Sequence, residues 1–199
     1  MTRLSLLLIL CFSGMALFAA NLGNREVKAQ DITKKDTIFL IGHAHMDMNW
    51  LWTTSETLKM SKDNLRQAVT FLEEYPGYTV LQSQAAIYQF IELTDPKVFE
   101  LLRKYVVEGR LEPVGGMWTE GDTNLSSGEA LCRSLLLAQR YFGQHFGRAA
   151  HVGRLPDNFG HAAQLPQLFK LAGMDYFLSH TEFSSCKVMH FLYEMRNMS

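Results

Sequence analysis

The expected fold follows from one stretch, Ile38-Phe39-Leu40-Ile41-Gly42-His43-Ala44-His45-Met46-Asp47. Its apolar first half indicates a short buried strand over residues 37–41, with polar residues at the carboxyl end of that strand. Side chains alternate along an extended chain, so His43, His45 and Asp47 fall on one side. Two imidazoles and a carboxylate suit a divalent metal, above all zinc. The alternative is a pair of histidines that are merely hydrogen-bonded in a turn.

Short apolar runs alternate with longer amphipathic stretches along the rest of the chain. We expect strands over residues 37–41, 78–83, 111–114, 151–155 and 176–179. We expect helices from Thr54 or Ser55 to about 75, from Asp95-Pro96 to Gly109, from Ser126 to about Gly143, and over 164–171. This alternation predicts an α/β fold in which helices pack on parallel strands. Ligand sites in such folds gather at the carboxyl ends of strands.

Residues 1–20 are typical of a secretory signal peptide. Arg3 precedes an uncharged, mostly apolar run that ends in Ala19-Ala20. A membrane anchor is the alternative, but the run is shorter than the roughly 20 apolar residues of a spanning helix, and Gly14 interrupts it. Residues 21–35 are expected to be a linker. The chain is therefore expected to be exported, to the periplasm or outside a bacterium, or into a eukaryotic secretory pathway. No stable membrane span is expected after signal cleavage.

The composition excludes some partners. With 19 basic and 20 acidic residues the net charge is −1, so there is no electrostatic reason to expect nucleic acid or an anionic membrane as a partner. Outside the signal, Cys132 and Cys186 are expected to be free or buried, with a disulfide as the minor alternative.

A second polar loop, Gly115-Gly116-Met117-Trp118-Thr119-Glu120-Gly121-Asp122-Thr123-Asn124, follows the strand expected over 111–114. Its paired glycines would let the backbone approach a ligand. Trp118 offers a flat apolar face for a sugar ring, and carboxylates and amides can hydrogen-bond sugar hydroxyls. The alternative is a polar loop in which Trp118 only packs.

A third loop, Leu155-Pro156-Asp157-Asn158-Phe159-Gly160-His161, follows the strand expected over 151–155. Asp157 could be a metal ligand, a nucleophile or a helix cap. Capping is the commonest role of a lone aspartate in this position. A His-x-Asp site at another strand end makes a shared pocket plausible.

Together these blocks resemble glycoside hydrolase family 38, the alpha-mannosidases. The first block runs from His43 to Trp52. The second is the Trp118 loop with Ser127-Gly128-Glu129, and the third is the Asp157 loop with Leu165-Pro166-Gln167 and Ala172-Gly173. The resemblance covers about residues 36–180. It implies that residues 36–182 are part of that family's amino-terminal catalytic domain, an incomplete seven-stranded α/β barrel.

The resemblance also implies roles for particular residues. His45, Asp47 and Asp157 would bind one Zn²⁺, and Asp157 would also be the nucleophile of a retaining glycosidase. His43 would support the site without binding the metal. Substrate would be bound by Trp50, Trp118, Asp122 and Asn124. The implied activity is hydrolysis of terminal alpha-mannosides in a mannose-containing oligosaccharide or glycan.

The chain also departs from the family's pattern. The resemblance places a fourth zinc ligand, a histidine, and the general acid, an aspartate, in family sequence that this chain does not contain. His180 and His190 lie outside the matching motifs and are weak substitutes. Residues 183–199 are expected to be an aberrant or truncated tail. We therefore expect an inactive or weakly active fragment.

Two other functions remain open. One is another metal-dependent hydrolase, of the amidohydrolase or polysaccharide deacetylase type, which would need further metal-binding histidines. The other is a non-catalytic remnant, in which three ligands should bind metal poorly.

Overall fold

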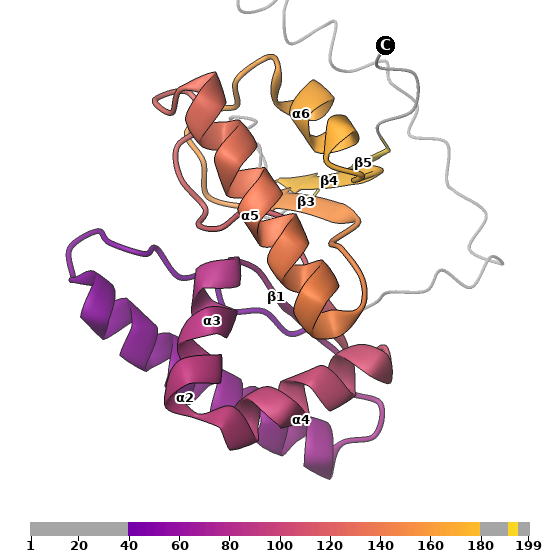
Figure 1. The fold of residues 1–199 in the computed structure, drawn as a ribbon. Coiled ribbons are helices and arrows are strands. Elements are labelled where there is room, and N and C mark those ends of the chain that lie inside the picture. The colour runs from indigo at the N-terminus through magenta and orange to yellow at the C-terminus, as the bar shows by residue number, and fades with distance from the viewer. Residues whose placement is uncertain (1–39, 180–190, 195–199) are drawn as a thin grey trace, which may run out of the picture. The chain divides into compact units, whose positions relative to one another are not determined.

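The computed structural model describes residues 40–179 and 191–194, and the side chains of residues 40–179. The predicted signal peptide 1–20, the predicted linker 21–35, Cys186, His180 and His190 lie outside the described residues. The elements follow the chain in this order (Figure 1): α2 Thr54–Glu74, β1 Val80–Gln82, α3 Ala85–Thr94, α4 Pro96–Val107, β2 Leu111–Pro113, α5 Gly128–Phe146, β3 Val152–Leu155, α6 Leu165–Leu171, β4 Tyr176–Ser179 and β5 Phe191–Glu194. The alternation of helices and parallel strands agrees with the predicted α/β class.

The helices begin where local side chains satisfy their first N–H groups. Thr53 and Glu56 form a capping box at α2, one residue before the predicted cap. Asp95 caps α4 and Pro96 occupies its first turn, as predicted. At α5 the cap is Ser127, which accepts from the Ala130 N–H, so the predicted capping box from Ser126 is wrong. The helix α3 was not predicted, because no side chain caps it.

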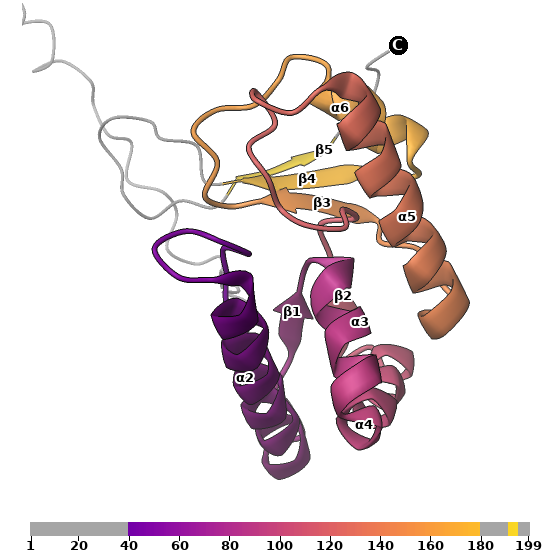
Figure 2. The ribbon, with the colours of Figure 1, turned by 60° about the vertical axis from the view of Figure 1, so that its left-hand side comes forward.

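The strands form two small sheets rather than one. β1 pairs with β2 in parallel, and β3 pairs with β4 in parallel. β5 pairs antiparallel with β4, although its residues belong to the tail that was expected to be aberrant. Figure 2 shows β3, β4 and β5 side by side. Between the sheets, the Gly115 N–H donates to the Val152 carbonyl oxygen at 2.8 Å. The described residues therefore do not show a seven-stranded barrel.

The first predicted strand is not seen in its described part. Leu40 and Ile41 are 89% and 51% exposed and lie outside any strand. Pairing begins at Gly42, which forms a single parallel bridge with Val80. This bridge still places the residues after Gly42 beside the carboxyl end of β1.

Two hydrophobic cores hold the elements. The larger core joins α2 to α5 with β1 and β2, and its centre includes Tyr88, Leu102 and Phe142, each 0% exposed. The smaller core lies between α5, β3 and α6, around Leu155 and Phe169. None of the helices within residues 40–179 is both long and apolar enough to cross a bilayer.

Candidate metal centre

Three predicted ligand residues come together in the structure. His45 and Asp47 lie in the segment after Gly42, and Asp157 lies in the loop after β3. Their candidate ligand atoms all lie within 4.8 Å of one another. His45 and Asp47 are half-buried, whereas Asp157 is exposed. The arrangement is the one that the resemblance implied, and the roles of the three side chains remain predictions.

The segment that carries His45 and Asp47 has no regular secondary structure, so side chains from neighbouring elements hold its backbone. The Gln84 side-chain amide donates to the Met46 carbonyl oxygen at 2.7 Å. The Asp47 carbonyl oxygen accepts from the Thr57 hydroxyl at 2.7 Å and from the Trp52 indole N–H at 3.1 Å. These contacts fix the loop from α2 and from the start of α3.

The three donors fit a zinc-sized ion. Ligand atoms about 2.0–2.2 Å from a tetrahedral zinc lie about 3.3–3.6 Å apart. The His45 Nε2 and Asp47 Oδ1 atoms are already 3.3 Å apart. An imidazole with two carboxylates is a donor set that zinc accepts. The cluster could therefore hold such an ion after a small movement of the exposed Asp157 side chain.

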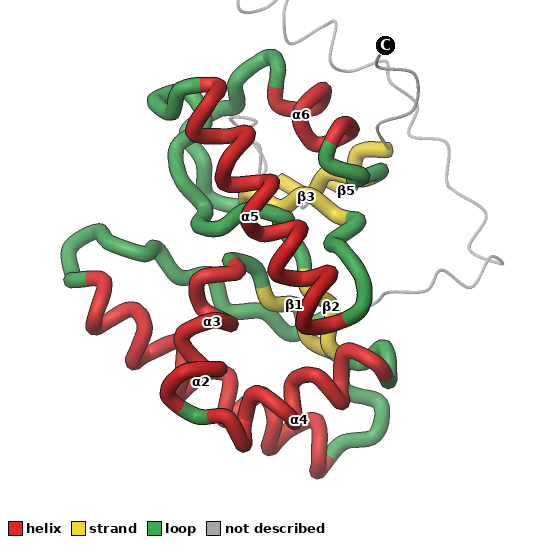
Figure 3. The backbone as a smooth tube through the Cα atoms, viewed as in Figure 1, coloured by secondary structure: helices red, strands yellow, loops and turns green. Residues whose placement is uncertain are grey.

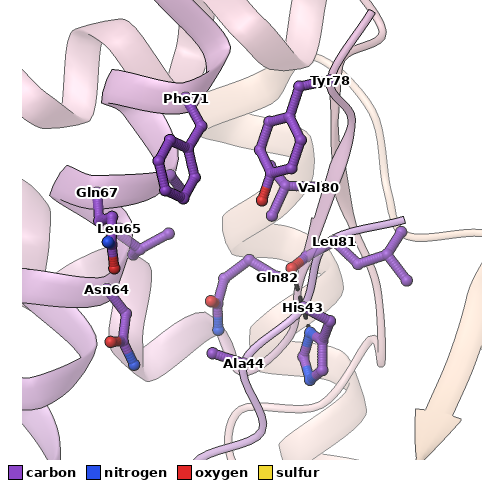
Figure 4. Close-up of a pocket in the computed structure, with 11 residues that line it drawn as sticks. His43, Ala44, Asn64, Leu65, Gln67, Phe71, Tyr78, Val80, Leu81 and Gln82 are labelled. Carbon is purple, nitrogen blue, oxygen red and sulfur yellow. Dashed lines mark hydrogen bonds between the residues drawn. The ribbon is translucent and has the colours of Figure 1, made fainter. Parts of the chain in front are cut away.

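His43 lies beside this cluster and is not one of the three groups that meet. Its Nδ1 is 3.2 Å from the Leu81 carbonyl oxygen, and its Nε2 is buried without a hydrogen-bond partner. Burial lowers the pKa of His43 to about 4, so the ring is neutral at pH 7. The ring also lines a pocket of about 130 Å³ between α2 and β1 (Figure 4).

Sequence reasoning missed two charged residues beneath the cluster. The side chains of Glu120 and Arg154 are both 3% exposed. Glu120 Oε2 lies 3.0 Å from His45 Nδ1, and Glu120 Oε1 lies 3.7 Å from Arg154 Nη1. Neither contact is aligned as a hydrogen bond. The neighbouring Glu120 carboxylate nevertheless raises the pKa of His45 against the opposing effect of burial. A usable signal was Arg154 itself, the one charged residue inside an otherwise uncharged strand.

The predicted substrate-binding tryptophans occupy different environments. Trp50 is 65% exposed and meets Trp52 edge-on, with the ring centroids 5.4 Å apart. Trp118 is half-buried, packs against the larger core, and meets Tyr141 edge-on at 5.9 Å. The sequence left open that Trp118 only packs, and in the structure its ring packs against the larger core.

The other predicted residues of the second loop shape the loop itself. The Asn124 N–H donates to Asp122 Oδ1 at 2.8 Å, which closes a turn. Gly116 has a positive φ of 65°, and a Cβ there would lie 2.6 Å from the Met174 sulfur. The positive φ alone therefore favours glycine here, without any ligand.

The second and third loops are tied to each other. They are residues 114–127 after β2 and 156–164 after β3, drawn as green tube in Figure 3. The Asn158 side-chain amide donates to the Gly121 carbonyl oxygen at 3.0 Å. The Ala162 N–H donates to the Thr123 hydroxyl at 3.3 Å. These bonds bring the loop that carries Asp157 to the loop that carries Glu120.

Comparisons with known proteins agree with the resemblance. Residues 35–190 match the family model described as glycosyl hydrolases family 38 N-terminal domain. Alpha-mannosidase G of Dictyostelium discoideum is 35% identical over 159 residues, which is 79% of this chain. Alpha-mannosidase 2C1 of Mus musculus is 38% identical over 143 residues, 72% of this chain.

The structural comparison gives the same fold. An alpha-mannosidase from Enterococcus faecalis superposes with a TM-score of 0.62 at 24% identity. The match covers 70% of this chain and 16% of that structure. The alignments likewise span only 15% and 14% of the two curated relatives.

Proposed function

Because the chain belongs to glycoside hydrolase family 38, we propose that it provides part of the active site of a zinc-dependent, retaining alpha-mannosidase. The substrate would be a terminal alpha-mannoside of a glycan. One observation supports the proposal: His45 and Asp47, in the segment after Gly42, and Asp157, in the loop after β3, have ligand atoms within 4.8 Å of one another.

In this proposal each side chain has a distinct task. His45, Asp47 and Asp157 hold the zinc, which when bound would take up adjacent sugar hydroxyls and polarise them. Asp157 is exposed and can reach a substrate, so its carboxylate would attack the anomeric carbon and displace the leaving oxygen. The exposed Trp50 indole would stack on the apolar face of the sugar. Asp122 and Asn124 would hydrogen-bond its hydroxyls.

The chain by itself is expected to turn over slowly or not at all. A retaining glycosidase needs a second carboxyl group as general acid, and the resemblance implies a fourth zinc ligand, a histidine. No group within residues 40–179 is assigned to either role. An aryl alpha-mannoside assay should therefore give little release with the purified chain. Zinc-dependent release at an ordinary enzymatic rate would contradict this expectation.

Substrate binding tests the proposal without relying on turnover. Saturation-transfer NMR of the full chain should detect methyl alpha-mannoside when zinc is present and lose the signal after chelation. Asp47→Ala should abolish the zinc-dependent signal, whereas Glu100→Gln, on the exposed face of α4, should retain it. A signal that is independent of zinc, or equal for methyl alpha-glucoside, would overturn the proposal.

Export is proposed for the same protein. Residues 1–20 would be removed as a signal peptide, and the mature chain would act in the periplasm, outside the cell or in the secretory pathway. Amino-terminal sequencing of the chain recovered from its native host should begin after about Ala20. A chain that retains Met1 would contradict export by this route.

A further inference from the structure

Two charged side chains are buried next to the candidate metal centre, one beside His45 and the other beside the first. Glu120 and Arg154 each expose 3% of their side-chain surface. Burying charge in a protein interior costs several kcal/mol per ion unless the charge is well compensated, and their closest approach is a loose 3.7 Å. Packing of apolar residues would fill this space at lower cost. The pair therefore calls for an explanation in terms of what it touches.

What Glu120 touches is the ring of a proposed metal ligand. Its Oε2 lies 3.0 Å from His45 Nδ1, while the other ring nitrogen, Nε2, lies 3.3 Å from Asp47 Oδ1. A neutral imidazole carries one N–H, and a carboxylate can only accept. Both neighbours of the ring are carboxylates, and the Asp47 contact already meets hydrogen-bond geometry. Glu120 is nearer and its side chain is 3% exposed, whereas that of Asp47 is 40% exposed and can accept from water instead. On this ground the proton is expected on Nδ1, with the Nε2 lone pair on the side of Asp47.

The side chain of Gln84 connects the backbone of Glu120 to the segment that carries His45. The Glu120 N–H donates to Gln84 Oε1 at 3.2 Å, and Gln84 Nε2 donates to the Met46 carbonyl oxygen at 2.7 Å. Gln84 is 1% exposed and has a φ of 65°, a conformation that costs a non-glycine residue of order 1–3 kcal/mol. The buried side chain of Gln84, on a strained backbone, thus links the loop of Glu120 to the loop of His45.

We propose that Glu120 is a positioning residue of the metal centre, which fixes the ring and tautomer of His45 while Arg154 and Gln84 hold Glu120 in place. This inference rests on the proposed zinc site. Carboxylates that accept the second N–H of a metal-bound histidine are a recurrent device, and their loss lowers metal affinity about 10–100-fold. Glu120 is not one of the three side chains whose ligand atoms meet, so in this proposal it acts through His45.

The first test reads the tautomer in the metal-free chain. Long-range ¹H–¹⁵N NMR, at a pH above the titration of His45 followed in the same experiment, should show its neutral ring protonated at Nδ1 in the wild-type chain. In the double variant Glu120→Met, Arg154→Met, which removes both buried charges together, the Nε2–H form should gain population. A wild-type ring protonated at Nε2, or a tautomer unaffected by the double variant, would overturn the inference.

The second test measures zinc affinity by competition with a chromogenic chelator. Glu120→Gln should weaken zinc binding about 10–100-fold. The matched control is Glu92→Gln, because the Glu92 carboxylate also lies near a histidine Nδ1, that of His145 at 3.5 Å, away from the centre. This control should leave the affinity within about twofold. Equal affinities for the wild type and Glu120→Gln would refute the positioning role. A wild-type chain that binds no zinc would refute the proposed site instead, and the tautomer measurement would still decide the role of Glu120.

Discussion

The larger hydrophobic core and the Glu120–Arg154 pair next to the metal centre both bury their side chains, but for different reasons. Phe142 is 0% exposed among aromatic neighbours, whereas the side chains of Glu120 and Arg154 are each 3% exposed and lie near each other. Burial of the phenyl ring is itself favourable, because it removes apolar surface from water. Burial of the ion pair opposes folding. Stability therefore explains the first region, and only the proposed site explains the second.

The largest expected effect on stability lies in the hydrophobic core. Phe142→Ala should lower the free energy of unfolding by about 3–5 kcal/mol, because it leaves a cavity beside Tyr88 and Phe146. Leu137→Ala on the same helix is the control, since Leu137 is 51% exposed. Urea unfolding should show less than about 0.5 kcal/mol for this control. Similar losses for both variants would mean that α5 does not pack as described.

The buried pair should respond to single and double changes in opposite ways. Arg154→Met should cost about 3 kcal/mol, because it leaves the Glu120 carboxylate buried without a counter-charge. Adding Glu120→Met should recover most of that loss, to within about 1 kcal/mol of the wild type. Urea unfolding of the three chains measures this cycle. A double variant that is less stable than Arg154→Met would show that the pair contributes to stability directly. The two buried regions would then not differ in the way described.

A smaller effect is expected at the start of α4, in the helical region. Asp95 caps this helix and its carboxylate accepts from Arg66, so Asp95→Ala should cost about 1 kcal/mol at pH 7. The hydrogen bond from Arg66 lowers the pKa of Asp95. A lowered folded-state pKa means that the stabilisation is complete above the unfolded pKa of about 4 and disappears as the pH falls through the folded value. Thermal melts of both chains should therefore converge in acid. A difference that persisted unchanged below about pH 2 would contradict the ionic contribution.

The smallest effect on stability is expected at the surface of the site. Trp50 is 65% exposed, so Trp50→Ala should change the free energy of unfolding by less than about 0.5 kcal/mol. The same variant should weaken the zinc-dependent NMR signal of methyl alpha-mannoside. Trp118→Ala should lower the free energy of unfolding and leave the mannoside signal unchanged, because its ring packs against the core. An unchanged mannoside signal in Trp50→Ala would remove this residue from the site.

The sequence predicted the parts of the fold that depend on local pattern. The strand over residues 176–179 and the Asp95-Pro96 helix start were predicted as observed, because apolar runs and caps are local signals. The helix α3 was missed because it begins at Ala85, shortly after β1 ends, and the side chain of its N-cap residue Gln84 makes no capping hydrogen bond. Pairing is non-local, so neither the antiparallel β5 nor the division into two sheets could be predicted from the strands alone.

The candidate site shows the same division. His45, Asp47 and Asp157 could be named from their motifs, and the structure brings them together. The sequence motifs assigned no role to Glu120, which lies in the second loop, or to Arg154, which lies in a predicted strand. A charged residue is usually solvated, so only three-dimensional burial shows that these two lie beneath His45.

The central claim is that His45, Asp47 and Asp157 form one zinc site, and zinc titration of the full chain tests it most directly. Competition with a chromogenic chelator should give one zinc per chain for the wild type and for Glu100→Gln. Asp157→Asn should lower the affinity more than about tenfold, because it weakens one of three ligands. Identical zinc binding by the wild type and Asp157→Asn, or no binding by the wild type, would contradict the account.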